Sequence, residues 1–348
     1  MTATPLQTLL NLPLPILQAP MAGVQAGALA IAVSEAGGLG ALPGAMLSPQ
    51  ALRDELAAIR AGTARPFNVN FFCHQQPAPD AAREAAWKEA LAPYYAEYGI
   101  DPASIPAGPG RAAFDAATAE LIAPFRPPVV SFHFGLPPAA LLEQVRSWGA
   151  KVLASATTVE EARWLEAHGA DAIIAQGAEA GGHRGMFLTT DTATQLGTFA
   201  LLPQVVRAVR VPVIAAGGIA DAAGVRAALQ LGAAAAQVGT AYLLCPEATT
   251  TPLHRRALQS EAAATTAMTN LFTGRPARGI VNRLMRELGP MSAAAPAFPL
   301  ATGALAPLRA KAESAGRDDF TSMWCGQNAS GCKAVPAGDL TRELAAGA

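Results

Sequence analysis

One stretch of the chain, residues 172–185, combines residue types that could transfer a proton beside a bound ligand. It opens with the apolar run 172–176, which is typical of a buried strand in a parallel sheet. Four glycines follow that run: Gly177, Gly181, Gly182 and Gly185. They let the backbone approach a flat or anionic ligand, and His183 among them exchanges protons near neutral pH. We interpret the stretch as a catalytic loop at the C-terminal end of a strand; the alternative is an ordinary turn that holds a solvated histidine.

The strand in this stretch belongs to a regular series of short apolar segments. The others cover residues 16–19, 39–43, 67–72, 129–134, 151–156, 211–216 and 235–241. Segments with helical spacing and capping residues separate them, such as Ser48 and Pro49 before the apolar face of residues 52–59 and Asp221 after residues 211–219. Eight strands alternating with helices predict a (β/α)8 TIM barrel of the α/β class. Two Rossmann-like halves are the alternative, which we disfavour because no GxGxxG motif with a downstream acid occurs.

Two regions fall outside the barrel pattern. Residues 73–126 are too long for an ordinary strand-to-helix connection and predict a helical insertion after the third strand, which could act as a flap over the site. We therefore expect a barrel over residues 1–260, including this insertion. Residues 261–348 should form a C-terminal helical extension that packs on the barrel and the substrate mouth.

The composition indicates a large core and a small ligand. Of 348 residues, 51% are hydrophobic and 15% are charged, with a net charge of −1. This balance favours one large domain and argues against nucleic acid or an anionic membrane surface as the main partner. The four cysteines lack CxxC spacing, and neither a leader nor a membrane-spanning run of about 18 residues is evident. We expect a cytoplasmic protein with reduced thiols, and the sequence leaves a homodimer open.

Barrel geometry predicts where function lies, because the loops after the strands meet at one mouth. The unusual residues at strand ends are Pro20, Met21, Asn70, His133, Gln176, His183, and the pairs Gly217-Gly218 and Gly239-Thr240. The two glycine-containing pairs follow strands seven and eight, where barrels offer backbone N–H groups to phosphate. A phosphate-bearing ligand is therefore expected.

These residues resemble the motifs of the nitronate monooxygenases, formerly 2-nitropropane dioxygenases, which are FMN-dependent TIM-barrel enzymes. The resemblance runs in order along most of the chain. Its motifs are Gln18-Ala-Pro-Met-Ala-Gly23, Phe67-Asn-Val-Asn70, Ser131-Phe-His-Phe-Gly135, Ala175-Gln-Gly-Ala-Glu-Ala-Gly-Gly-His-Arg-Gly185, Pro212-Val-Ile-Ala-Ala-Gly-Gly-Ile219, Gln237-Val-Gly-Thr240 and Phe320-Thr-Ser-Met-Trp-Cys-Gly-Gln327. The run that contains His183 is the most specific of them.

The resemblance implies a set of cofactor contacts. FMN would lie across the mouth with its ring system, ribityl chain and phosphate held by Ala19, Pro20, Met21, Asn70, Gln176, Gly181, Gly217, Gly218, Gln237, Gly239 and Thr240. In the family, the histidine that matches His183 is the catalytic acid/base. His133 would be a second polar contact to the substrate or flavin, although a hydrogen-bonded histidine inside the barrel is an equal alternative.

The same resemblance implies the reaction. Alkyl nitronates, such as propionate 3-nitronate, would be oxidised with O2 to carbonyl compounds and nitrite, without a metal. One alternative is an FMN-dependent NAD(P)H reductase of the enoyl-acyl-carrier-protein or quinone type, and another is a non-catalytic FMN-binding barrel.

Several other polar residues suggest structural roles. His168 at a helix end suits the helix dipole, and His74 and His254 lie in surface-like sequence contexts. Arg309 and Lys311 are expected to be solvated rather than bound to a substrate carboxylate. Residues 301–304 lack the aromatic side chains that we expect to shape the substrate pocket in relatives, so the substrate itself stays open.

Overall fold

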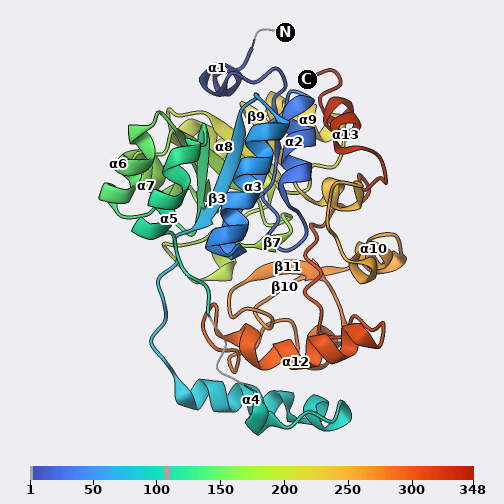
Figure 1. Cartoon of the computed structure of the whole chain (residues 1–348). Helices are drawn as coiled ribbons and strands as arrows, with labels where there is room; N and C mark the ends of the chain where they lie inside the picture. Colours follow the sequence, from blue (N-terminus) through green and yellow to red (C-terminus); the bar gives the residue numbers. More distant parts are fainter. Residues whose placement is uncertain (1–2, 106–109) are drawn as a thin grey trace.

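The computed structural model describes residues 3–105 and 110–348, and within them a parallel eight-stranded sheet closes into a barrel (Figure 1). Its strands are β1 (Ile16–Gln18), β2 (Gly40–Pro43), β3 (Phe67–Phe72), β4 (Val129–His133), β5 (Lys151–Ala156), β6 (Ala172–Gln176), β8 (Val213–Ala216) and β9 (Ala235–Val238). The strand order is β1-β9-β8-β6-β5-β4-β3-β2. Leu39, just before β2, closes the barrel against β1: its N–H donates to Ile16 O and its carbonyl accepts from Gln18 N, each at 2.9 Å. The predicted TIM barrel is confirmed.

Among the elements that the structure describes, seven helices follow the strands on the outside of the barrel, six of them as predicted and one, α5 (Ala116–Ile122), within the segment predicted as an insertion. The other six are α2 (Gly27–Glu35), α3 (Pro49–Gly62), α6 (Ala139–Ser147), α7 (Val159–Ala167), α8 (Thr198–Ala208) and α9 (Ala222–Gln230). Ser48 caps α3 by accepting a hydrogen bond from Ala51 N, and Asp221 caps α9 in the same way from Gly224 N. Burial of one apolar face on the sheet holds each helix in place.

The eighth outer position is filled from the far end of the chain. After β9 the chain turns into a short 3₁₀ helix (Thr240–Leu244), and α13 (Ala337–Leu344) packs beside α2 and α9. Leu340 and Leu344 are buried against Val33 and Val225 there. The extension therefore does more than cover the mouth, because its last helix completes the ring around the barrel (Figure 1).

The opposite end of the barrel is closed by α1 (Pro5–Leu10), which the sequence analysis did not anticipate. Leu6 and Leu10 are buried in the cluster that fills the bottom of the barrel. Thr4 and Gln7 form a capping box that begins the helix.

The insertion and the extension pack on each other beyond the mouth. Helix α4 (Ala81–Glu97) lies against α12 (Ala301–Ser314), next to α11 (Arg283–Glu287), and Figure 1 shows α4 on the far side of α12 from the barrel. Trp87 Nε1 donates to Ala301 O at 3.2 Å, and Tyr95 OH donates to Ala304 O at 2.7 Å. Helix α4 is therefore not a flap laid directly on the site. Residues 106–109 of the insertion lie outside the described residues.

A small antiparallel sheet connects the extension to the predicted catalytic loop. It has the order β10 (Thr266–Thr269), β11 (Ala277–Ile280), β7 (Gly182–His183), with Ala277 opposite His183. Gly182 and His183, predicted within a catalytic loop, thus form a short edge strand. Among the described residues, no helix is both long and apolar enough to cross a membrane.

Candidate active site

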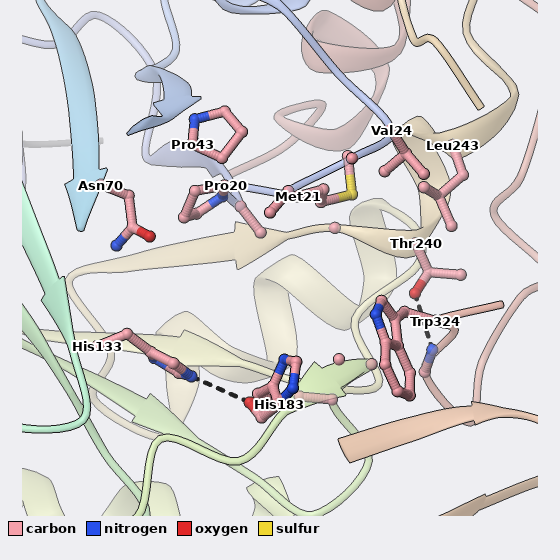
Figure 2. A pocket seen from close by; sticks show the side chains of 18 of the residues that line it. Pro20, Met21, Val24, Pro43, Asn70, His133, His183, Thr240, Leu243 and Trp324 are labelled. Carbon is pink, nitrogen blue, oxygen red and sulfur yellow. Dashed lines mark hydrogen bonds between the residues drawn. The ribbon is translucent and has the colours of Figure 1, made fainter. Parts of the chain in front are cut away.

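All of the predicted site residues line one cavity of about 290 Å³ at the C-terminal ends of the barrel strands. They are Ala19, Pro20, Met21, Asn70, His133, Gln176, Gly181, His183, Gly217, Gly218, Gln237, Gly239 and Thr240. Residues of the insertion and the extension line it too, including Arg111, Arg309 and Trp324. Pro20 and Met21 lie on one side of the cavity and His183 and Trp324 on the facing side (Figure 2).

The backbone of His183 is held by side chains at the ends of two barrel strands, β4 and β6, which flank β5. Its carbonyl accepts hydrogen bonds from Gln176 Nε2 at 3.0 Å and from His133 Nε2 at 3.1 Å. On its other side, the backbone of Gly182 and His183 pairs with β11. The histidine is therefore clamped between the barrel and the extension, which pre-organises its ring.

The ring of His183 has one engaged and one available nitrogen. Nε2 lies 2.8 Å from Thr273 Oγ1, and Thr273 is itself buried. In the described part of the chain, Nδ1 has no hydrogen-bond partner, and the residue lines the cavity. A ligand in the cavity can therefore meet this nitrogen.

The surroundings of His183 keep its ring neutral. Burial lowers the pKa of His183 well below its usual value, and the positive charges of Arg111 and Arg275 and the ring of His133 lower it further. At neutral pH the imidazole can thus accept a proton. A cation formed there would be disfavoured unless an anion lay beside it.

His133 is fully hydrogen-bonded within the protein. Its Nε2 faces a carbonyl, which can only accept, so Nε2 carries the proton and Nδ1 accepts from Ser155 Oγ at 3.0 Å. Burial lowers the pKa of His133 to about 4, although the bond to His183 O opposes this shift. This geometry favours the alternative of a satisfied interior histidine that positions His183.

The two residues that follow His183 hold the end of β6. Gln176 Oε1 accepts from Gly185 N at 2.8 Å, and Arg184 donates to Gly177 O at 2.6 Å and to Gln176 O at 2.5 Å. Arg184 is fully buried and turns away from the cavity lining. Its role is to fix the loop.

One end of the cavity is rich in backbone donors. Gly217 and Gly218 have φ of 116° and 74°, conformations that favour glycine. Over residues 3–105 and 110–348, the N–H groups of Gly218, Gly239 and Thr240 have no hydrogen-bond partner. Such a cluster of unpaired donors after the last two barrel strands suits a phosphate group. The residues present thus fit the phosphate end of a flavin mononucleotide.

The extension supplies contacts at this end that the sequence analysis missed. Gly326 N donates to Thr240 Oγ1 at 3.0 Å, and Asn328 Nδ2 donates to Gly218 O at 3.0 Å. Both residues line the cavity. No spacing identified them, although Gly326 lies in the motif 320–327 that carries part of the family resemblance.

Aromatic side chains line or flank the cavity on the side of the histidines. Phe72 lines it, and Phe72, Phe134 and Phe298 form one buried cluster. The ring centroids of Phe298 and Trp324 each lie 5.4 Å from that of His183. Residues 301–304, expected near the substrate, instead begin α12 and accept hydrogen bonds from α4. The hydrophobic wall therefore comes from other segments.

The prediction that His74 and His254 lie at the surface is wrong. Both are buried, and His254 lines the cavity. Their neighbours in sequence are polar, but the insertion and the extension cover them. His168 does end α7 as predicted, and its ring stacks on Trp164 at 3.8 Å.

The two cations expected to be solvated have different surroundings. Arg309 lines the cavity and forms an ion pair with Glu313 at 3.0 Å, whereas Lys311 Nζ donates to Tyr98 O at 2.9 Å. Lys311 thus helps to tie α12 to the insertion.

Comparison with known proteins agrees with this geometry. The family model for nitronate monooxygenase matches residues 3–347. A nitronate monooxygenase of Pseudomonas aeruginosa is 42% identical over 344 residues, covering 97% of this chain and 96% of that protein. The solved nitroalkane oxidase of Streptomyces ansochromogenes is 41% identical with a TM-score of 0.86, covering 98% of this chain and 96% of that one.

A more distant solved structure, FabK from Thermotoga maritima, is 28% identical with a TM-score of 0.73 and covers 99% of this chain and 95% of that one. The enzymes named for nitro compounds are therefore more similar to this chain than FabK is. By sequence, fold and site, the chain belongs to the nitronate monooxygenase family, a group of flavin-dependent oxidoreductases.

Proposed function

We propose that this enzyme binds FMN across the barrel mouth and oxidises alkyl nitronates with O2 to carbonyl compounds and nitrite. When bound, FMN supplies the redox chemistry by accepting electrons from the substrate. The observation that carries the proposal is the position of His183. Its available Nδ1 opens onto the same cavity as the unpaired N–H groups of Gly218, Gly239 and Thr240.

Each group of lining residues has a part in this proposal. Gly217, Gly218, Gly239 and Thr240 would hold the phosphate, and Ala19, Pro20 and Met21 would face the ring system across from His183 and Trp324. Asn70 donates to Ser131 O at 3.2 Å and to Ser131 Oγ at 3.0 Å, which leaves its Oδ1 to accept from the cofactor. Gly181, Gln176 and Gln237 would complete the contacts.

His183 would act differently on the two forms of a nitro compound. A neutral nitroalkane has an acidic α-C–H bond, and the neutral imidazole can take that proton at Nδ1. A preformed nitronate has already lost the proton, so His183 only positions it and interacts with its charge. The lowered pKa of His183 keeps the base unprotonated at neutral pH, and the negative charge that develops on the substrate would offset the cost of forming the imidazolium.

Anaerobic reduction tests the reaction against its two alternatives. The purified holoenzyme is mixed without O2 with an alkyl nitronate or with NADH, and the visible absorbance of the flavin is followed. Bleaching by the nitronate supports the proposal, and bleaching by NADH alone would support the reductase alternative. Bleaching by neither would favour a non-catalytic flavin protein. FMN itself is identified by chromatography of the cofactor released on denaturation.

Four broader predictions accompany this function. The division into a barrel over 1–260 and an extension over 261–348 is supported by the small sheet and by α12, but α13 returns to the barrel. A cytoplasmic location and a homodimer stay predictions. The partners we expect are a small nitronate and O2.

A further inference from the structure

Arg111 reaches the cavity from outside the barrel. It lies in the insertion between α4 and α5, and lines the same cavity as His183 and His133. Its guanidinium carbon lies 5.5 Å from the centroid of the Phe298 ring, which is 5.4 Å from the ring of His183. The Phe298 ring thus lies near both residues, although Phe298 itself does not line the cavity.

The backbone of Arg111 is anchored to the segment that follows β3. His74 Nε2 lies 2.9 Å from Arg111 O, and Gln76 also donates to this carbonyl. Phe114 N donates to Phe72 O at 2.8 Å, which ties the chain just after Arg111 to the end of the strand. The arginine is therefore positioned by the barrel although it belongs to the insertion.

Among residues 3–105 and 110–348, no carboxylate is paired with the guanidinium of Arg111. Across the described ranges it forms neither an ion pair nor a side-chain hydrogen bond. Burial and the positive charge of Arg309 lower the pKa of Arg111. A partly buried cation that faces another cation is costly, and an anion in the cavity would remove that cost.

We propose that Arg111 is a substrate-binding residue that holds the negatively charged nitronate group beside His183. This inference rests on the proposed function. A nitronate carries its charge on two oxygens in one plane, a shape that matches the planar fork of a guanidinium. With a neutral nitroalkane, the α-proton passes to His183 Nδ1 and the C–H electron pair forms the C=N bond. The charge then develops on the oxygens, where Arg111 can stabilise it.

A kinetic comparison of two substrates tests this role. In Arg111→Met, the KM for ethyl nitronate should rise about 10- to 100-fold with kcat little changed, because a charge-assisted contact to the ground state is lost. For nitroethane, kcat should fall over a similar range while KM stays nearly constant, because the charge appears only during proton transfer. Arg111→Lys keeps the charge without the fork and should fall between the wild type and Arg111→Met.

The pH profile gives an independent readout. The groups that face His183 and bear on its charge are Arg111, Arg275 and His133. Removing the charge of Arg111 should raise the pKa of His183 toward its usual value, since one cation near it is gone. The acid limb of kcat/KM for nitroethane should then move to higher pH in Arg111→Met and stay in place in Arg111→Lys.

Binding of nitrate, a planar oxyanion that the enzyme cannot oxidise, is measured from the flavin absorbance of the oxidised holoenzyme. Its Kd should rise about 10- to 100-fold in Arg111→Met. Arg83→Met is the matched control, because Arg83 lies in the same insertion but does not line the cavity. Flavin content and melting temperature of each variant establish that it is folded.

Three outcomes would overturn the inference. Equal changes in both kinetic parameters on both substrates would indicate a structural role. A loss confined to nitronates with a remote carboxylate would place the far end of the substrate at Arg111. Unchanged nitrate binding would remove the contact altogether. If the wild-type holoenzyme oxidises neither substrate, the proposed function fails first, and that result is distinct from these three.

Discussion

Thr273 determines which ring nitrogen of His183 carries the proton, and its hydroxyl can be removed with little change in shape by Thr273→Val. Thr273 Oγ1 lies 2.8 Å from His183 Nε2 and 3.5 Å from Arg275 O. A carbonyl can only accept, so the hydroxyl donates to Arg275 O and accepts from Nε2–H of His183. This arrangement leaves Nδ1 unprotonated on the cavity side, ready to act as a base.

The structure sets the size of the expected effect. Thr273 is 4% exposed, so valine would leave the Nε2–H group unpaired in buried surroundings, at a cost of about 1–3 kcal/mol. The tautomer with the proton on Nδ1 then competes, and it cannot accept the α-proton. We expect kcat/KM for nitroethane to fall about 5- to 100-fold, since about 1.4 kcal/mol corresponds to a tenfold change in rate. For ethyl nitronate, which has no proton to lose, the decrease should stay within about threefold.

The assay compares kcat/KM on the two substrates for wild type, Thr273→Val and Thr273→Ser. Serine keeps the hydroxyl and should restore most of the activity on nitroethane. Matching melting temperatures would exclude a general loss of structure. The reasoning is refuted if both substrates lose activity equally in the valine variant, or if serine fails to restore proton removal.

Two further predictions concern the cofactor and pH. Gly218 has a φ of 74°, a conformation that costs a residue with a side chain about 1–2 kcal/mol. A valine there would also crowd the proposed phosphate site, so Gly218→Val should purify colourless. Full FMN content in this variant would contradict the phosphate assignment. Burial lowers the pKa values of His133 and His254 to about 4. Between about pH 6.5 and 4 the unfolded chain therefore binds more protons than the folded protein, and the free energy of unfolding should fall as the pH decreases. The decrease is up to about 1.4 kcal/mol per pH unit for each histidine. Melting temperature against pH measures this slope, which His254→Leu should make shallower; an identical slope in that variant would show that His254 does not contribute.

The barrel and its mouth were predictable because their signals are local. Apolar strands, helix caps such as Ser48 and Asp221, and glycines after the last two strands all act within a few residues. Barrel topology then brings the strand ends together, so that residues as far apart as Pro20 and Thr240 line one cavity.

The remaining features depend on contacts between distant segments. His183 pairs with Ala277 and bonds Thr273, and α13 reaches back to α2, all across about ninety residues or more. No residue spacing in the sequence predicts such contacts. Burial of His74 and His254 was missed for the same reason, since polar neighbours in sequence do not show which segments will cover them.

The role of His183 as base is the central claim, and His183→Asn tests it most directly. Asparagine can donate a hydrogen bond to an anionic substrate but cannot take the α-proton. The measurement is the ratio of kcat/KM on nitroethane to that on ethyl nitronate, for wild type and variant. We predict that the nitroethane activity falls by about 10² to 10⁴ while the nitronate activity falls far less, so the ratio collapses. An unchanged ratio would contradict proton transfer by His183 and leave it only a positioning role.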